Sequence, residues 1–235
     1  MALTQEEIRR KLLHLFALIM PVGLFYFPQW WDFYPYWLSV ALLAFFFFGS
    51  VIVETLRFRV PVVQKIFYKC FGHMMRTEEK AKVTGSTYVV GAALLCSILF
   101  WDESLRHISF MVLTMFILGD AVAAIVGLSV GRVKIGKKSL EGSAACFLLC
   151  MALFYVLFAN LPGLRFGYGM EWGTHMLIAA AASLSITVFE LIPLRITPKL
   201  VINDNLAVPV ITGGIILFME HALNVRVFIA EGQLL

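Results

Sequence analysis

The chain has 235 residues, of which 60% are hydrophobic and only 14% are charged, and its formal net charge is +4. This composition excludes an ordinary soluble domain, in which about a quarter of the residues are charged. The basic residues are spread between apolar runs, which argues against a nucleic-acid-binding protein. We therefore expect an all-α polytopic membrane protein that forms a single domain over residues 1–235.

Seven apolar stretches are long enough to be interpreted as membrane-spanning helices. The expected spans cover residues 12–28, 36–54, 86–101, 108–128, 143–161, 174–193 and 206–224. Between the second and third spans, the stretch PVVQKIFYKCFGHMM alternates apolar and basic residues at roughly helical spacing. This pattern predicts an amphipathic helix on the inner leaflet. No cleavable signal peptide is evident, because the polar N-terminus leads directly into a long span.

The distribution of basic residues indicates how these spans are oriented. Sixteen of the 19 Lys and Arg residues lie in alternate connections, and the other three are Arg106, Arg165 and Arg226. Cytoplasmic loops carry the excess of Lys and Arg, so the N-terminus and the loop 136–142 are expected in the cytoplasm. An odd number of spans would then place the C-terminus outside.

The first span is entered through the pattern Glu7-x-x-Arg10-Lys11-x-x-His14, which places these side chains on one helical face. A charge cluster at the inner leaflet would explain most of it. His14, however, lies among Leu and Phe residues, where an idle imidazole is poorly placed. We therefore keep His14 as a candidate functional residue.

A second polar motif precedes the third span. Arg76 and Glu79 are separated by one helical turn, and Thr84-Gly85-Ser86-Thr87-Tyr88 follows. The motif offers a cytoplasmic ion pair and a polar entrance to the span. An ordinary surface salt bridge explains the pair almost as well.

Asp120 stands inside the fourth span, between FMVLTMFILG and AVAAIVGL. It lies roughly 12 Å from the cytoplasmic end of the span at about 1.5 Å per residue. An ionised carboxylate at that depth costs several kcal/mol unless it faces a polar cavity or a partner. We expect a functional acid in a water-filled pocket open to the cytoplasm; the alternative is a structural acid paired with a basic side chain.

The end of the fourth span and the following loop combine small and basic residues. Glycines allow close backbone approach, lysines bind phosphate oxygens, and the next helix presents its N-terminus, which favours phosphate. Helix-packing glycines and topology-determining lysines are the alternatives. The residues concerned are Gly127, Gly131, Lys137, Lys138, Ser139, Glu141 and Gly142.

Further acids are expected on the same side of the membrane. Glu190 lies near the inner end of the sixth span, and Asn203-Asp204-Asn205 comes just before the seventh. Asp204 could equally be an ordinary turn or helix-capping residue.

Taken in order, these motifs resemble the CTP-dependent lipid-alcohol kinases, which include dolichol kinase, phytol kinase and the yeast-type diacylglycerol kinase. The resemblance covers nearly the whole chain. It is carried by the motifs at 7–14, 76–88, 119–142 and 190–209. Asn203 departs from the pattern, because many members have a further Asp there.

The resemblance implies transfer of a phosphoryl group from CTP to a membrane lipid alcohol at the cytoplasmic face, with Mg²⁺ as cofactor. The acceptor would be a polyprenol, a phytol-like isoprenoid or diacylglycerol. The implied catalytic residues are Asp120, Asp204, Glu141 and His14, of which Asp120, Glu141 and Asp204 would be metal ligands. The implied nucleotide-binding residues are Gly127, Gly131, Lys137, Lys138, Ser139, Gly142, Arg76 and Asn205.

Two other functions fit part of the pattern. Phosphatidate cytidylyltransferases also carry Gly-Asp, spaced glycines and a lysine-rich loop, but their Pro-Gly-His-Gly-Gly segment has no counterpart in LIPLRITPKLVINDNLAVP. A transporter would explain buried acids. It would leave the lysine-rich loop without a role.

Overall fold

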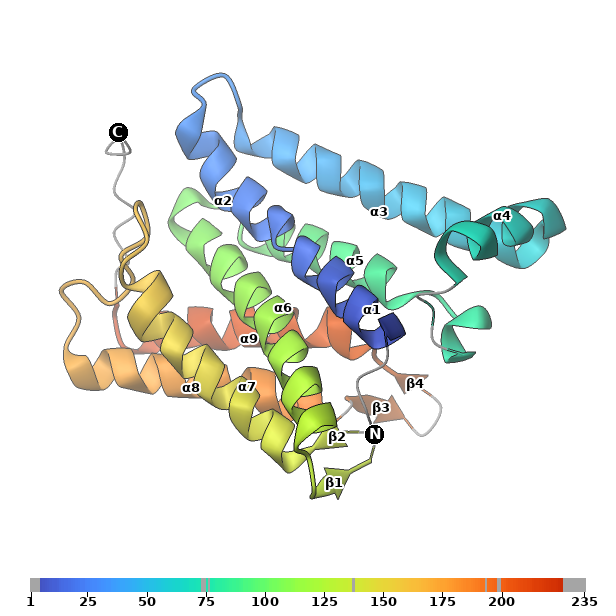
Figure 1. Cartoon of the computed structure of the whole chain (residues 1–235). Coiled ribbons are helices and arrows are strands. Elements are labelled where there is room, and N and C mark those ends of the chain that lie inside the picture. Colours follow the sequence, from blue (N-terminus) through green and yellow to red (C-terminus); the bar gives the residue numbers. More distant parts are fainter. Residues whose placement is uncertain are drawn as a thin grey trace.

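The computed structural model describes residues 5–72, 75, 77–136, 138–192, 194–197 and 200–225. Within these ranges the protein is an all-α polytopic membrane protein (Figure 1). Six helical segments are long and apolar enough to cross a membrane: Arg10–Trp30, Tyr36–Arg59, Glu103–Ser129, Leu140–Phe158, Trp172–Leu191 and Asp204–Ala222.

The expected third span, over residues 86–101, is present as a helix whose ends lie within two residues of those bounds. This helix, α5 (Gly85–Leu99), has 15 residues, a length of about 22 Å against a hydrocarbon core of about 30 Å. It packs against α3 (Tyr36–Arg59) and α9 (Asp204–Ala222). The described chain thus has six helical segments long enough to cross a membrane and one shorter apolar helix at the position of the third expected span.

The first span is divided into α1 (Gln5–Phe16) and α2 (Ile19–Trp30). Pro21 lacks the backbone N–H that would bond to the carbonyl of Ala17. That carbonyl accepts instead from the N–H of Met20 at 3.0 Å, which tightens the turn. The local break lets α1 present its polar face to the rest of the bundle.

The amphipathic helix predicted after the second span is present as α4 (Pro61–Phe71). Pro61 starts it, because its fixed φ suits the first helical position. None of its residues is buried, and Val62, Ile66 and Phe71 are exposed. The turn η2 (Thr77–Lys80) follows. Attachment of α4 to the inner leaflet stays a prediction.

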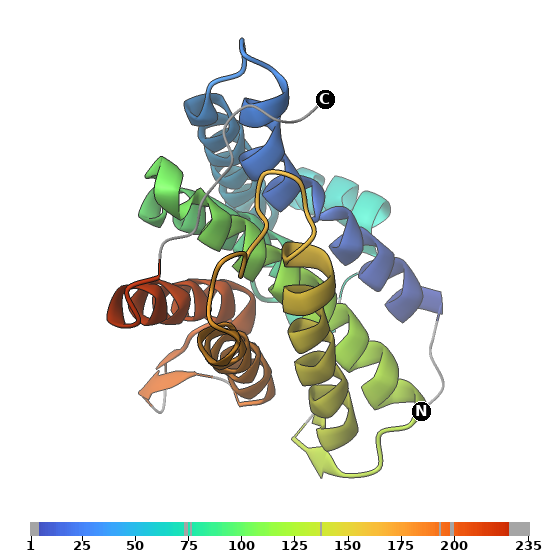
Figure 2. The same ribbon diagram turned by 90° about the vertical axis from the view of Figure 1, so that its left-hand side faces the viewer.

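Helix α6 (Arg106–Ser129), preceded by the turn η3 (Glu103–Leu105), is the centre of the bundle. It packs against α2 and α9 and against two later helices, α7 (Leu140–Ala152) and α8 (Trp172–Leu191). Helix α7 continues as a π-helical segment, η4 (Leu153–Phe158). Both views place α6 between α1 and α2 on one side and α8 and α9 on the other (Figures 1 and 2).

Two short antiparallel hairpins were not predicted. One pairs β1 (Lys134–Ile135) with β2 (Lys138–Ser139), and the other pairs β3 (Arg195–Thr197) with β4 (Leu200–Val201). Gly136 begins the first turn with φ of +61°, a conformation that favours glycine. Both hairpins lie at the end of the bundle that holds α1 and the start of α9 (Figure 1).

Candidate active site

The first cluster of the site joins α1 to α6. The ammonium Nζ of Lys11 lies 2.6 Å from Oδ2 of Asp120 and also donates to the backbone carbonyl of Asp120 at 3.1 Å. His14 Nε2 lies 3.2 Å from the same carboxylate oxygen but is not aligned to donate to it, so this buried nitrogen lacks a hydrogen-bond partner. Asp120 is therefore paired with a basic side chain, yet 22% of the Asp120 side chain stays exposed.

The second cluster joins β2 to the ends of α8 and α9. Lys138 Nζ lies 2.6 Å from Oε1 of Glu190 and 3.1 Å from Oδ2 of Asp204, and it also donates to the backbone carbonyl of Glu190. The Glu190 side chain is almost completely buried, whereas the side chains of Lys138 and Asp204 are about one third exposed. One ammonium thus holds two carboxylates from different helices.

The two clusters interact electrostatically, because the charge of Asp120 acts on Glu190 and that of Lys138 acts on Asp120. Burial alone would lower the pKa of Lys138, but the Glu190 and Asp204 carboxylates outweigh it. The pKa of Lys138 is therefore raised, and the side chain stays an ammonium group. An ammonium between acids is suited to exchange a carboxylate for a phosphate oxygen.

The glycines near the site serve close packing. A methyl group added at Gly127 would lie 2.8 Å from the hydroxyl of Ser139, and additions at Gly131 or Gly142 would also meet that hydroxyl. Ser139 caps α7 by accepting from the N–H of Gly142 at 3.2 Å. The packing interpretation of these glycines therefore has direct structural support, and their contact with a nucleotide stays a prediction.

Glu141 lies apart from both clusters. Its Oε1 accepts from the backbone N–H groups of Arg132 and Val133 at 3.0 and 3.1 Å. The carboxylate thus fixes the loop between α6 and β1. The predicted set of Asp120, Glu141 and Asp204 is not gathered in one place, and no three His, Cys, Asp or Glu side chains among the described residues form a preformed metal site.

Asn205 connects two sequence motifs that are far apart in the chain. Its side-chain amide donates to the carbonyl of Gly85 at 3.1 Å. Glu79 accepts from the N–H of Gly85 at 2.9 Å. The N-termini of α5 and α9 are thereby joined beside the site. Two predicted nucleotide contacts, Lys137 and Arg76, and the side chain of Glu7 lie outside the described residues.

Sequence reasoning missed a buried ion pair. Arg57, whose side chain is completely buried, donates from Nε to Oε2 of Glu54 at 2.5 Å and from Nη2 to the carbonyls of Glu79 and Lys82. Oε1 of Glu54 accepts from the N–H and hydroxyl of Thr84 at 3.0 and 2.6 Å. From the sequence alone, Arg57 is one of the basic residues whose distribution indicates how the spans are oriented. A carboxylate inside FFFFGSVIVETL with Arg three residues later was the available signal.

The chain is similar to known proteins from three organisms. The chain is similar to an uncharacterised protein of Rickettsia prowazekii, 25% identical over 207 residues that cover 86% of this chain and 89% of that one. It is also similar to phytol kinase 1 of Arabidopsis thaliana, 28% identical over 88% of this chain and 65% of that one, and to a probable phytol kinase 1 of Glycine max, 29% identical over 58% and 44%. The chain therefore spans less than two thirds of either plant protein. No protein-family model and no solved structure matches it.

Proposed function

We propose that this protein is a lipid kinase that transfers the γ-phosphoryl group of CTP to the hydroxyl of a membrane lipid alcohol. The observation that carries the proposal is that two carboxylate and ammonium clusters, from α1, α6, β2, α8 and α9, lie at one end of a membrane-spanning bundle. The similarity to two plant phytol kinases supports the same reaction class and favours an isoprenoid alcohol as acceptor.

Asp120 is the proposed general base. Its carboxylate is exposed in part, and Lys11 holds one of its oxygens in place. A carboxylate within hydrogen-bond reach of the lipid hydroxyl can accept its proton as the oxygen attacks the γ-phosphorus. His14 Nε2 lies 3.2 Å from the same carboxylate oxygen, and His14 is proposed to help position it.

Lys138 is the proposed phosphate contact. Its ammonium binds Asp204 at the more exposed edge of the cluster, and the approach of a triphosphate would let it exchange that carboxylate for a phosphate oxygen. Phosphoryl transfer requires mainly positioning and stabilisation of negative charge. An ammonium fixed by Glu190 on its buried side provides both.

The donor set fits Mg²⁺. This ion is usually held by one or two carboxylates together with substrate phosphates and water, and Asp120 and Asp204 are partly exposed carboxylates at the same end of the bundle. These two side chains would hold it, whereas Glu141 is occupied by backbone amides. When bound, Mg²⁺ would neutralise charge on the nucleotide phosphates.

The proposed orientation places this end of the bundle at the cytoplasmic face. Most of the Lys and Arg residues lie in connections on the side that carries α1 and the β1–β2 hairpin. Nucleotide would thus reach the site from the cytoplasm, while the acceptor would enter from the bilayer.

The reaction is tested with purified protein in detergent, phytol, Mg²⁺ and CTP labelled at either the α- or the γ-phosphate. The expected result is organic-phase label from γ-labelled CTP alone, with release of CDP. ATP, GTP and UTP are tested in place of CTP as alternative phosphoryl donors. Omission of Mg²⁺ should abolish transfer.

A phosphatidate cytidylyltransferase would give a different result with the same reagents. In this test phosphatidate replaces phytol. Organic-phase label from α-labelled CTP, together with release of pyrophosphate, would overturn the kinase assignment.

A further inference from the structure

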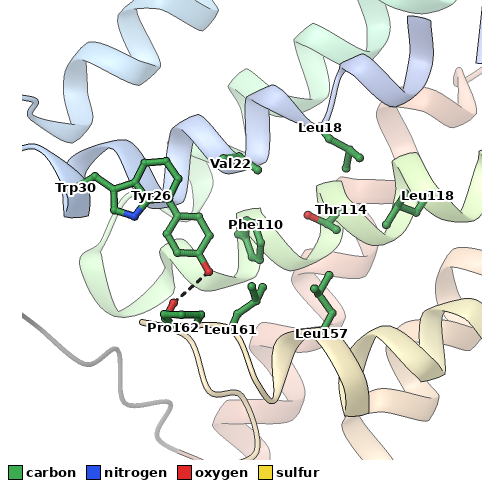
Figure 3. A pocket seen from close by; sticks show the side chains of 10 residues that line it. All are labelled: Leu18, Val22, Tyr26, Trp30, Phe110, Thr114, Leu118, Leu157, Leu161 and Pro162. Atoms are coloured by element: carbon green, nitrogen blue, oxygen red, sulfur yellow. Dashed lines mark hydrogen bonds between the residues drawn. The ribbon is translucent and has the colours of Figure 1, made fainter. Parts of the chain in front are cut away.

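Two apolar surfaces of the described chain differ in the charges around them. The groove between α2, α6 and η4 has a volume of about 370 Å³, and none of the residues that line it is charged (Figure 3). The Tyr26 hydroxyl in this groove donates to the carbonyl of Pro162 at 3.1 Å and is therefore occupied. Nothing in this lining selects one lipid over another. The exposed apolar face of α4 differs from the groove, because basic side chains border it.

The apolar face of α4 and its basic border follow from the spacing of the residues. Residues four apart lie one above the other on a helix, so Val62, Ile66 and Cys70 form one row, and all three are exposed. Lys65 and Lys69 form the adjacent row and are exposed as well. An apolar strip and a charged strip therefore run side by side along the exposed surface of α4.

The length of α3 places α4 at the level of the lipid headgroups. Helix α3 has 24 residues, a length of about 36 Å at about 1.5 Å per residue, against a hydrocarbon core of about 30 Å. Helix α4 begins at Pro61, directly after the C-terminal end of α3 (Figure 1). From that level an apolar strip can enter the acyl chains while neighbouring lysines reach the headgroup phosphates.

Positive charge is concentrated around α4. The segment 59–82 contains six Lys and Arg residues and two Glu residues, so its net charge of +4 equals that of the whole chain. The Tyr68 hydroxyl on α4 donates to the carbonyl of Lys80 at 3.1 Å, and Arg57 donates to the carbonyl of Lys82. Lys80 and Lys82 are both exposed. These contacts hold a second pair of exposed lysines beside the helix.

We propose that α4, together with Lys80 and Lys82, is a docking surface for the headgroups of anionic phospholipids. The complementary charge selects these lipids over zwitterionic ones, and each lysine near an anionic surface changes the ratio of docked to undocked helix about fivefold. Topology alone requires basic residues in a cytoplasmic loop, but not their alignment beside an exposed apolar strip. None of these residues belongs to the two clusters of the candidate active site, so the lipid preference of α4 does not depend on the reaction that the protein catalyses.

Cys70 allows the docking of α4 to be measured in the unmodified protein. It is exposed, whereas Cys96, Cys146 and Cys150 are buried, so a thiol-reactive fluorophore should label α4 selectively. The labelled protein is placed in nanodiscs of phosphatidylcholine, or of phosphatidylcholine and phosphatidylglycerol in equal amounts, with brominated acyl chains throughout. Bromine quenches a fluorophore that enters the acyl region. We expect stronger quenching in the anionic discs, and high salt should remove the difference because it screens exposed charges.

Paired substitutions test whether the lysines of α4 cause this preference. In Lys65→Gln with Lys69→Gln, the ratio of docked to undocked helix in the anionic discs should fall roughly 25-fold, and quenching in pure phosphatidylcholine should stay unchanged. Arg132→Gln with Lys134→Gln is the matched control, because it removes two exposed basic residues from β1 and the loop before it. This control should keep the full response to phosphatidylglycerol.

Three results would overturn the assignment of α4 to anionic lipid. The first is equal quenching in the two kinds of disc by the unmodified protein. The second is an equal response to phosphatidylglycerol in the two double variants, since the lysines of α4 would then have no special role. The third is efficient crosslinking of two chains through Cys70 in dilute detergent solution, which would make a second copy of the chain the occupant of this face.

Discussion

Glu54 with Arg57 and Asp120 with Lys11 are two of the carboxylate and cation pairs among the described residues, and they differ in their exposure to solvent. Glu54 and Arg57 are closed off from solvent, and the carboxylate accepts from Arg57 and from both the N–H and hydroxyl of Thr84. Asp120 is paired with Lys11 but remains 22% exposed. Each place also holds one buried nitrogen without a hydrogen-bond partner, His14 Nε2 and Arg57 Nη1, so exposure is what distinguishes the two pairs.

The contrast separates a structural pair from a candidate functional one. A buried charge is tolerated when its hydrogen bonds are filled, and removal of one partner is then expensive. A pair that keeps exposed surface can accept a ligand without opening a buried network. Substitutions in the Glu54 pair should therefore affect folding, whereas substitutions in the Asp120 pair should affect turnover.

The largest effect is expected from Asp120→Asn. The amide keeps the shape of the side chain but cannot accept the lipid proton, so the rate should fall about a hundredfold or more. The thermal unfolding temperature should fall less than in Arg57→Met, because Asp120 is partly exposed and the amide oxygen can still accept from Lys11. Initial rates with γ-labelled CTP and phytol measure the loss.

The control is Asp102→Asn, which removes an exposed acid bonded to Ser104 just before α6, at the end of that helix away from Asp120. It should retain full activity. Near-normal turnover in Asp120→Asn would make Asp120 a structural residue like Glu54.

The next effect is on stability. Arg57→Met leaves Glu54 buried without its ionic partner, which should cost roughly 3–5 kcal/mol in the free energy of unfolding. Chemical denaturation in detergent measures it, and activity per folded molecule should be retained. Arg59→Met, an exposed neighbour on α3, should be nearly neutral; equal stability of the two variants would contradict the comparison.

A smaller effect is expected at Lys138. Loss of one charged contact to phosphate in Lys138→Met should raise the KM for CTP about tenfold. Lys134→Met removes one exposed charge from the same hairpin and should change the KM less. If the two variants behaved alike, the specific role of Lys138 would be lost.

The pH dependence of this contact follows from the raised pKa of Lys138. Because the pKa of Lys138 is raised above its ordinary value of about 10.4, the side chain stays an ammonium group at lower pH. It loses its proton only as the pH rises above that value. The KM for CTP should therefore show no titration by Lys138 between about pH 7 and pH 9. Lys138→Arg should preserve this flat profile.

The smallest effect is expected at Asn205. Asn205→Ala removes its bond to the carbonyl of Gly85, which should cost about 1 kcal/mol of stability, with a modest loss of activity because α5 and α9 are less firmly joined. Asn160→Ala removes only local bonds at the other end of the bundle. Greater destabilisation by Asn160→Ala would contradict a joining role for Asn205.

Several sequence predictions are confirmed and others are corrected. Helices occupy all seven expected spans, and α4 is present, because hydropathy and helical spacing act locally. The break at Pro21 and the two hairpins were missed. The pairing of Glu190 with Lys138 gives Glu190 a more central position than Glu141, whose carboxylate binds its own loop.

The sequence by itself determined which segments enter the membrane and that Asp120 is an acid requiring a partner there, because desolvation depends on local composition. Only the tertiary structure decided the partners. Lys11 lies 109 residues from Asp120, and Lys138 lies 52 residues from Glu190. Such pairs depend on how the helices pack against one another. The packing of each helix depends on several of its faces at once, which the local sequence does not specify. The same packing decided that the Arg57 side chain is completely buried while about one third of the Lys138 side chain is exposed.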